Sequence, residues 1–369
     1  MVRTKIALIT NTINRAGGAE SVTITMFKAL RSIINVNVYV LGREPLNKDL
    51  LNRWVDPQSI NELEKSYITI RSRLKDLKEL LNFDLIINTR SNEVLLPAHV
   101  HYIHWVFSPI GVKDPYALAY YRKAYNIEGI SIKHIIRHVA HYINIKFSRA
   151  VLANSRYTAD LLKEEGINAK VLYPPVRSRE IIRYTSGIRY GDKDRLVITI
   201  SRIDSGKQLE LIPLIASKVR DARFVLVGSL ANEEYYAKLL RLRKAFNAEN
   251  FVIIPNIPRD QLYDLLGRAM IYLHTAHHEQ FGIAVVEGMA AGCVPVVHRS
   301  GGPYHDIIAK DTYGFSYINY EETIAIIKDI IHERGKYREL SEEARLRSLS
   351  FDEAVFSLKF KKFIEQLID

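Results

Sequence analysis

Short apolar runs alternate with helix-length amphipathic stretches along most of this chain. The runs that predict buried strands are residues 6–10, 36–41, 85–87, 99–106, 150–154, 196–200, 223–227, 251–254, 271–275 and 294–297. The stretches with helical spacing are residues 17–31, 62–81, 158–165, 209–220, 233–246, 259–270, 282–291, 323–333 and 341 to the C-terminus. Nearly continuous apolar strands separated by helices are typical of parallel sheets covered on both faces. The pattern therefore predicts an α/β protein.

The alternation falls into two series that meet at Tyr173-Pro174-Pro175-Val176. Paired prolines stiffen a chain and resist both helix and central strand, so we place a domain link there, with residues 1–175 before it and 176–349 after it. The polar stretch 178–194 is expected to be a loop. Ligands of open parallel sheets lie outside the carboxyl ends of the strands. The residues that follow the strands are therefore the ones to read for chemistry.

Cysteine content and hydropathy limit the class of protein. The single cysteine, Cys293, excludes a disulfide within the chain and a zinc site built from cysteines. No apolar stretch approaches the roughly 18 residues of a membrane-spanning helix, and the first apolar run is too short for a signal peptide. These features predict a cytoplasmic protein, or one peripheral on the cytoplasmic membrane face. The net charge of +11 attracts polyanions such as nucleic acid, acidic lipid or phosphorylated ligands.

Positive charge concentrates between residues 113 and 149, where seven Lys or Arg residues stand against two acidic ones. A basic amphipathic helix suits a membrane interface, so we expect peripheral contact of the segment 116–149 with an anionic membrane. The alternative is a helix that packs in the core of the first domain. No recognised nucleic-acid motif accompanies the segment, so nucleic acid is not expected as a partner. The apolar positions at helical spacing are Ile132, Ile135, Ile136, Val139 and Ile143.

Two cations follow the strand predicted at residues 196–200. Arg202 and Lys207 lie five apart in a loop that leads into a helix. Such a pair suits a diphosphate, because its charge adds to the free backbone N–H groups of a helix N-terminus. If the diphosphate is a leaving group, the same cations stabilise the charge that develops on it. The alternative is a solvated basic loop.

The most informative stretch covers residues 274–292. Glu279 falls in the loop before a predicted helix, and Glu287 falls about two turns inside it. A glutamate inside an apolar helix is costly without partners. Paired ribose hydroxyls would satisfy Glu287, and a buried salt bridge is the alternative. The helix start is expected to leave three N–H groups free for a phosphate or a sugar hydroxyl, those of Phe281, Gly282 and Ile283.

Two local patterns raise the question of a metal. His277 and His278 adjoin Glu279, but neighbouring loop residues rarely bind one ion together. The triplet 192–194 has the form D-x-D, and its place before a strand in a polar stretch favours a solvated turn. We therefore expect no metal and no other cofactor.

The stretch with both glutamates resembles the E-x7-E signature of glycosyltransferase family 4, the retaining enzymes of the GT-B fold. Within that family the sequence is most similar to the α-1,2-mannosyltransferases that extend lipid-diphosphate-linked oligosaccharides and use GDP-mannose. The similarity covers nearly the whole chain. Further pieces match the family in its order along the chain, namely Gly17-Gly18-Ala19-Glu20, Tyr102-Ile103-His104-Trp105, Ala153-Asn154-Ser155-Arg156-Tyr157-Thr158, Arg202 with Lys207, and Ser300-Gly301-Gly302-Pro303.

The resemblance implies a GT-B fold, in which two Rossmann-like domains with parallel sheets face each other across a cleft. A final helix, at about residues 350–369, would pack back on the first domain. The donor would be a nucleotide sugar. Arg202 and Lys207 would hold its diphosphate, and Glu287 would bind its ribose hydroxyls.

The resemblance also implies which residues meet the donor sugar. Glu279, with the N–H groups that follow it, would contact the sugar, and His104 would face it from the first domain. Gly17 and Gly18 would let the backbone of the first domain approach the phosphates. The candidate catalytic residues are therefore His104, Glu279, Arg202 and Lys207.

The implied activity is transfer of a hexose, with mannose from GDP-mannose as the first choice, to a lipid-linked oligosaccharide or another glycan. His277, His278 and Gln280 flank the donor-sugar position and differ from the residues usual in the mannosyltransferases. A UDP-linked donor such as UDP-glucose is therefore an alternative. A non-catalytic GT-B module that binds a nucleotide sugar is a second alternative, against which the intact charged residues argue.

Overall fold

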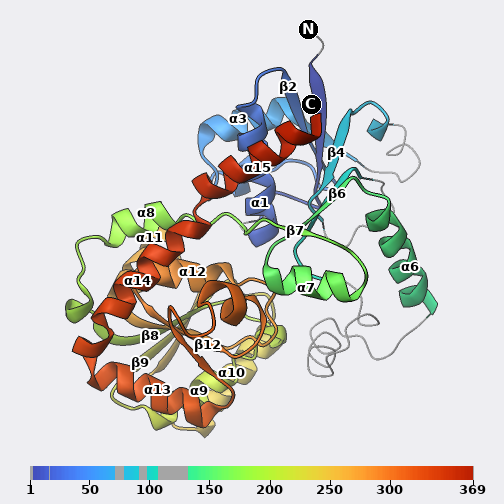
Figure 1. The fold of residues 1–369 in the computed structure, drawn as a ribbon. Coiled ribbons are helices and arrows are strands. Elements are labelled where there is room, and N and C mark those ends of the chain that lie inside the picture. The colour runs from blue at the N-terminus through green and yellow to red at the C-terminus, as the bar shows by residue number, and fades with distance from the viewer. Residues whose placement is uncertain (1–2, 16, 71–78, 91–97, 107–131, 369) are drawn as a thin grey trace. The chain divides into compact units, whose positions relative to one another are not determined.

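The computed structural model describes residues 3–15, 17–70, 79–90, 98–106 and 132–368 of the 369-residue chain. These residues form two compact units (Figure 1). The first contains the described residues up to Pro175 together with the C-terminal helix from Glu353, and the second runs from Val176 to Asp352. The segments at which the chain enters and leaves the second unit lie side by side, and the Val176 N–H donates to the Phe351 carbonyl at 2.9 Å.

The first unit is built on a parallel sheet of seven strands in the order β3-β2-β1-β4-β5-β6-β7. Its strands are β1 (Thr4–Ile9), β2 (Val36–Gly42), β3 (Tyr67–Thr69), β4 (Leu85–Asn88), β5 (Val100–Ile103), β6 (Ala150–Ala153) and β7 (Lys170–Val171). Its helices are α1 (Gly18–Arg31), α2 (Lys48–Leu51), α3 (Pro57–Ser66), α6 (Ile132–Lys146), α7 (Arg156–Glu164) and α15 (Glu353–Ile368).

Both faces of this sheet are buried. Along β1, Ile6 and Leu8 belong to one apolar cluster while Ala7 and Ile9 belong to another, as the alternation of side chains along a strand requires. The first cluster also includes apolar residues of α1 and of α15, among them Phe360. The C-terminal helix therefore covers the first sheet beside α1.

The second unit repeats this architecture with six parallel strands in the order β10-β9-β8-β11-β12-β13. Its strands are β8 (Asp194–Ile200), β9 (Arg223–Gly228), β10 (Phe251–Pro255), β11 (Ala269–His274), β12 (Val294–His298) and β13 (Phe315–Tyr317). Its helices are α8 (Ser178–Thr185), α9 (Leu211–Lys218), α10 (Glu233–Ala245), α11 (Arg259–Arg268), α12 (Ile283–Ala290), α13 (Tyr320–His332) and α14 (Arg338–Ser348).

Strand order decides where each unit can bind a ligand. In the second sheet β8 lies between β9 and β11, so the chain progresses in opposite directions on the two sides of β8. The loops after β8 and β11 diverge at this reversal, and ligands of such sheets bind in the crevice between them. In the first sheet the equivalent position lies between β1 and β4.

Two expectations about local structure are wrong. The helix predicted over residues 62–81 ends at Ser66, where β3 begins. The aromatic and β-branched residues of β3 pair with the end of β2, and this pairing outweighs the helical spacing of the leucines. Residues 71–78 lie outside the described part of the chain.

The second error concerns the expected loop 178–194. It contains α8 and a short 3-10 turn, Tyr190–Asp192. Helix α8 buries Ile181 and Thr185, which lie one turn apart on the same face. The helix was not expected because most of its residues are polar. In the D-x-D triplet the two aspartates are exposed, as expected of a solvated turn, but Lys193 between them is only 2% exposed.

Candidate functional site

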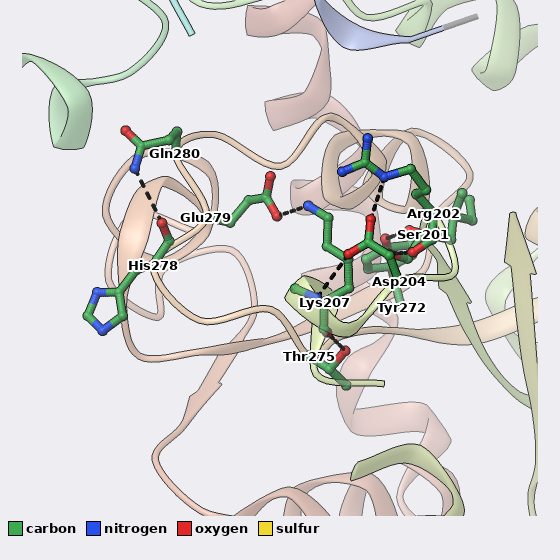
Figure 2. A network of polar contacts seen from close by, with 11 residues as sticks. Ser201, Arg202, Asp204, Lys207, Tyr272, Thr275, His278, Glu279 and Gln280 are labelled. Carbon is green, nitrogen blue, oxygen red and sulfur yellow. Dashed lines mark hydrogen bonds and ion pairs between the residues drawn. The ribbon is translucent and has the colours of Figure 1, made fainter. Parts of the chain in front are cut away.

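The loop after β8 carries the two predicted phosphate-binding cations (Figure 2). It continues beside β9, since the Ile203 N–H donates to the Ser229 carbonyl at 2.9 Å. Lys207 ends a short 3-10 turn, and its carbonyl accepts a hydrogen bond from the Thr275 hydroxyl at 2.8 Å. Arg202 forms an ion pair with Asp204. Helix α9 begins only at Leu211, so the cations lie in a loop and turn that precede the helix N-terminus.

The loop after β11 carries Glu279 and packs against the Ser300-Gly301-Gly302-Pro303 motif. The Gly302 N–H donates to the Glu279 carbonyl at 2.8 Å. A Cβ on Gly301 would lie 2.4 Å from that carbonyl oxygen, and one on Gly302 would lie 2.3 Å from the carbonyl oxygen of Gln280. Only glycine permits backbones to approach this closely. The Ser-Gly-Gly-Pro motif therefore fixes the position of the Glu279 loop.

Glu279 and Lys207 join the two loops. Their side chains form an ion pair, and each is 22% exposed. Burial by itself would raise the pKa of Glu279, but the charge of Lys207, with weaker contributions from His274 and Arg202, outweighs burial and lowers it. Glu279 is therefore an anion at neutral pH and can accept hydrogen bonds.

Four histidines lie in this loop or next to it. The rings of His277 and His298 stack with centroids 3.5 Å apart, and His298 Nδ1 lies 2.7 Å from the hydroxyl of Ser300. That hydroxyl also accepts the His278 N–H at 2.9 Å. Burial lowers the pKa of His274 and of His277 to about 4, so both are neutral at pH 7. The stack anchors the Glu279 loop, a role that the sequence does not reveal because His298 lies on β12, far along the chain from His277.

Glu287 lies on α12, which packs closely on β11: a Cβ on Gly288 would lie 2.6 Å from the ring of Tyr272. Burial raises the pKa of Glu287 to about 7, although the charges of Arg259 and Arg177 partly offset this. Its carboxylate makes no hydrogen bond or ion pair with any described residue, which disfavours the buried salt bridge considered as an alternative. A ligand with paired hydroxyls would supply the missing partners.

The first unit holds the other predicted residues. Gly17 caps the N-terminus of α1 and Gly18 begins the helix, both exposed. His104 follows β5, and its Nε2 donates to the Thr89 carbonyl at 3.0 Å. Burial lowers the pKa of His104 to about 4. The Thr89 hydroxyl lies 2.8 Å from that of Thr23 on α1, so Thr89 links His104 to the helix that the two glycines begin.

The structure therefore brings Arg202, Lys207 and Glu279 close together, because Lys207 pairs with Glu279 and the charges of both cations act on it. In the second unit the loops after two adjacent strands, β8 and β11, hold Arg202, Lys207 and Glu279, and α12 adds Glu287. Among the described residues, no three His, Cys, Asp or Glu side chains are grouped so that they could hold a metal ion. No helix in the described part of the chain is long and apolar enough to cross a membrane.

Two Rossmann-like parallel sheets, the second with cations and carboxylates where its strand order reverses, define a GT-B fold. The structure of Anabaena Alr3699/HepE in complex with UDP and glucose aligns with a TM-score of 0.76 over 98% of this chain and 100% of that chain, at 19% identity. The glycosyltransferase WaaG of lipopolysaccharide biosynthesis aligns with a TM-score of 0.69 over 97% and 99% of the two chains, at 15% identity. The GT-B fold predicted from the sequence is confirmed.

Residues 185–347 match the family model of the glycosyl transferases group 1, and this match confirms the predicted resemblance over that part of the chain. GDP-Man:Man(3)GlcNAc(2)-PP-Dol alpha-1,2-mannosyltransferase of Dictyostelium discoideum is 31% identical over 243 residues, 60% of this chain and 48% of that protein. The human protein of the same name is 29% identical over 242 residues, 60% and 49% of the two chains. The chain thus spans about half the length of the curated relatives it matches.

Proposed function

We propose that this protein transfers a hexose from a nucleotide sugar, with GDP-mannose as the donor, to a lipid-linked oligosaccharide or a related glycan. One observation carries the proposal: the second unit places Arg202, Lys207 and Glu279 on loops that follow adjacent strands, with Glu287 on the helix after them. The cations can bind a diphosphate. The ionised carboxylate can accept hydrogen bonds from a hexose, and the second carboxyl group can bind a ribose. The printed names of the mannosyltransferase relatives support the choice of donor.

The chemistry proposed for the site is departure of the nucleoside diphosphate without a metal. Arg202 and Lys207 would stabilise the charge that develops on the diphosphate, and one well-placed group of this kind is worth roughly 3 kcal/mol in the transition state. Glu279 would orient the hexose through its hydroxyls. Glu287 would hold the ribose. The roles that the family resemblance gives to Gly17, Gly18 and His104 in the first unit stay predictions.

The test is incubation with a panel of nucleotide sugars in the presence of chelator, with release of nucleoside diphosphate as the readout. We expect release from GDP-mannose, faster when a lipid-diphosphate-linked glycan acceptor is added. Faster release from UDP-glucose would change the donor and keep the enzyme class. Release from no member of the panel, with acceptor present, would refute a glycosyltransferase activity and favour a binding module.

We further propose that α6 lies on an anionic membrane surface, where a lipid-linked acceptor would be found. One stripe of the helix and its end is apolar and exposed: Ile136 at 62%, Ile143 at 49% and Phe147 at 84%. Residues 132–149 include four Lys or Arg and no Asp or Glu. Each basic residue near an anionic surface adds about 1 kcal/mol to membrane binding. The exposed apolar side chains and the positive charge of α6 therefore both favour binding to an anionic membrane.

Vesicle binding tests this surface. Replacing Ile143 and Phe147 together by serine is expected to lower the fraction bound to phosphatidylglycerol vesicles by about tenfold, because two exposed apolar side chains can no longer enter the interface. The matched control is Leu358→Ser on α15, a residue 68% exposed in the same unit, which should bind like the unmodified protein. Equal loss in the control, or undiminished binding of the double variant, would contradict the proposal.

A further inference from the structure

We propose that the ion pair between Lys207 and Glu279 makes the site discriminate against the bare nucleoside diphosphate and in favour of the intact nucleotide sugar. The inference rests on the proposed function and deepens it. The same pair would weaken retention of the diphosphate product after the sugar has left. Glu279 is then a specificity-determining residue as well as a sugar contact.

Hydrogen bonds hold the backbone of both residues of the ion pair in place. The backbone of Lys207 is bound by the Thr275 hydroxyl at 2.8 Å, and the backbone of Glu279 is bound by the Gly302 N–H at 2.8 Å. The two loops follow adjacent parallel strands, β8 and β11. Each side chain is 22% exposed, so water screens their attraction only in part. The ammonium of Lys207 is therefore bound by the carboxylate of Glu279 in this structure (Figure 2).

A diphosphate that binds Lys207 has to share its ammonium with Glu279 or displace the carboxylate. It also brings negative charge close to a carboxylate that is itself ionised. When a hexose is attached, its hydroxyls donate to Glu279 and replace the bonds that the lysine gives up. The bare diphosphate offers no such donors and leaves a partly buried anion without compensation.

The neighbouring pair of Arg202 and Asp204 does not impose the same cost. Arg202 is 63% exposed, so its interaction with Asp204 is well screened. Asp204 also accepts the backbone N–H of Gly206 at 2.9 Å. If a diphosphate attracts Arg202, Asp204 therefore keeps a partner. Of these two pairs, only that of Lys207 and Glu279 makes the affinity for a diphosphate depend on the presence of a hexose.

Calorimetric titration of Glu279→Gln with GDP and with GDP-mannose, without acceptor, tests the inference. Glutamine keeps the size of the side chain and removes its charge. We expect the affinity for GDP to rise about fivefold, because Lys207 is released, while the affinity for GDP-mannose falls. Glu249→Gln is the matched control: it removes an exposed carboxylate of the same unit just before β10, outside the candidate site, and it should leave the affinity for GDP unchanged.

The double variant Glu279→Gln with Lys207→Met separates the ion pair from a general effect of charge. The gain in GDP affinity should vanish when Lys207 is already absent. A gain that persists in the Lys207→Met background, or no gain in Glu279→Gln when the unmodified protein binds GDP-mannose, would overturn the inference and leave the proposed function intact. An unmodified protein that binds neither GDP nor UDP, free or sugar-linked, would refute the proposed function and the inference with it.

Discussion

Replacing Lys207 by methionine is expected to lower kcat/KM for the donor by about a hundredfold or more, as loss of one group that stabilises developing charge does in other enzymes. The substitution has two effects at this site. It removes a cation from the proposed diphosphate position, and it leaves the carboxylate of Glu279 without its ion-pair partner. Initial rates of nucleoside diphosphate release measure the loss. Folding of the variant is checked by circular dichroism.

A matched lysine gives the control. Lys218 lies exposed in the last turn of α9, within the same unit but outside the candidate site. Lys218→Met should keep the rate of the unmodified protein within about a factor of two, because exposed substitutions of this kind have small effects. A Lys207→Met variant that retains a third or more of its activity would exclude Lys207 from the reaction.

The second large effect concerns stability. Lys193→Met is expected to lower the free energy of unfolding by about 3 kcal/mol or more, because buried carbonyl groups lose their partners. Lys193 is 2% exposed, and its ammonium donates to the carbonyl oxygens of Gly267, Ala269 and Ala291 at 2.7, 3.0 and 2.9 Å. All three donors of the ammonium are therefore used.

The position of those carbonyl groups explains why a lysine is tolerated in the interior. Gly267 and Ala269 lie at the C-terminal end of α11, and Ala291 caps the C-terminal end of α12. Helix C-termini carry partial negative charge, which a cation stabilises. Lys193 thereby ties α12, the helix of Glu287, to the start of β11.

Urea unfolding followed by circular dichroism measures this contribution, with Lys218→Met again as the exposed counterpart. Lys218→Met should change the free energy of unfolding by less than about 0.5 kcal/mol. If Lys193→Met were destabilised by no more than that control, the three hydrogen bonds would not hold the two helices together.

A residue's role can be predicted from the sequence when it depends on nearby strands and helices, and not when it depends on contacts with distant parts of the chain. Arg202, Lys207 and Glu279 could be chosen because they follow apolar runs that form strands, and the carboxyl ends of parallel strands meet at one edge of a sheet. The spacing of Glu279 and Glu287 follows from a loop that leads directly into a helix. Position relative to strands and helices is a local property, and the sequence records it well.

Lys193 shows what the sequence does not record. Its partners are backbone carbonyl groups 74, 76 and 98 positions away. Every residue has such a carbonyl group, so the sequence does not show which ones bind the lysine. The two aspartates beside it are exposed, as a solvated turn predicts, and they give no sign that the lysine between them is buried. The stack of His277 on His298 was missed for a related reason, since it requires the pairing of β11 with β12. Strand order, which only the structure gives, decides both.

A structure of the protein with a bound nucleotide sugar would show whether the second unit is the donor site. We expect a diphosphate within hydrogen-bonding distance of Arg202 and Lys207, a ribose whose hydroxyls contact the carboxylate of Glu287, and a hexose beside Glu279. A nucleotide bound anywhere else on the protein, with the ion pair of Lys207 and Glu279 unchanged, would contradict this expectation.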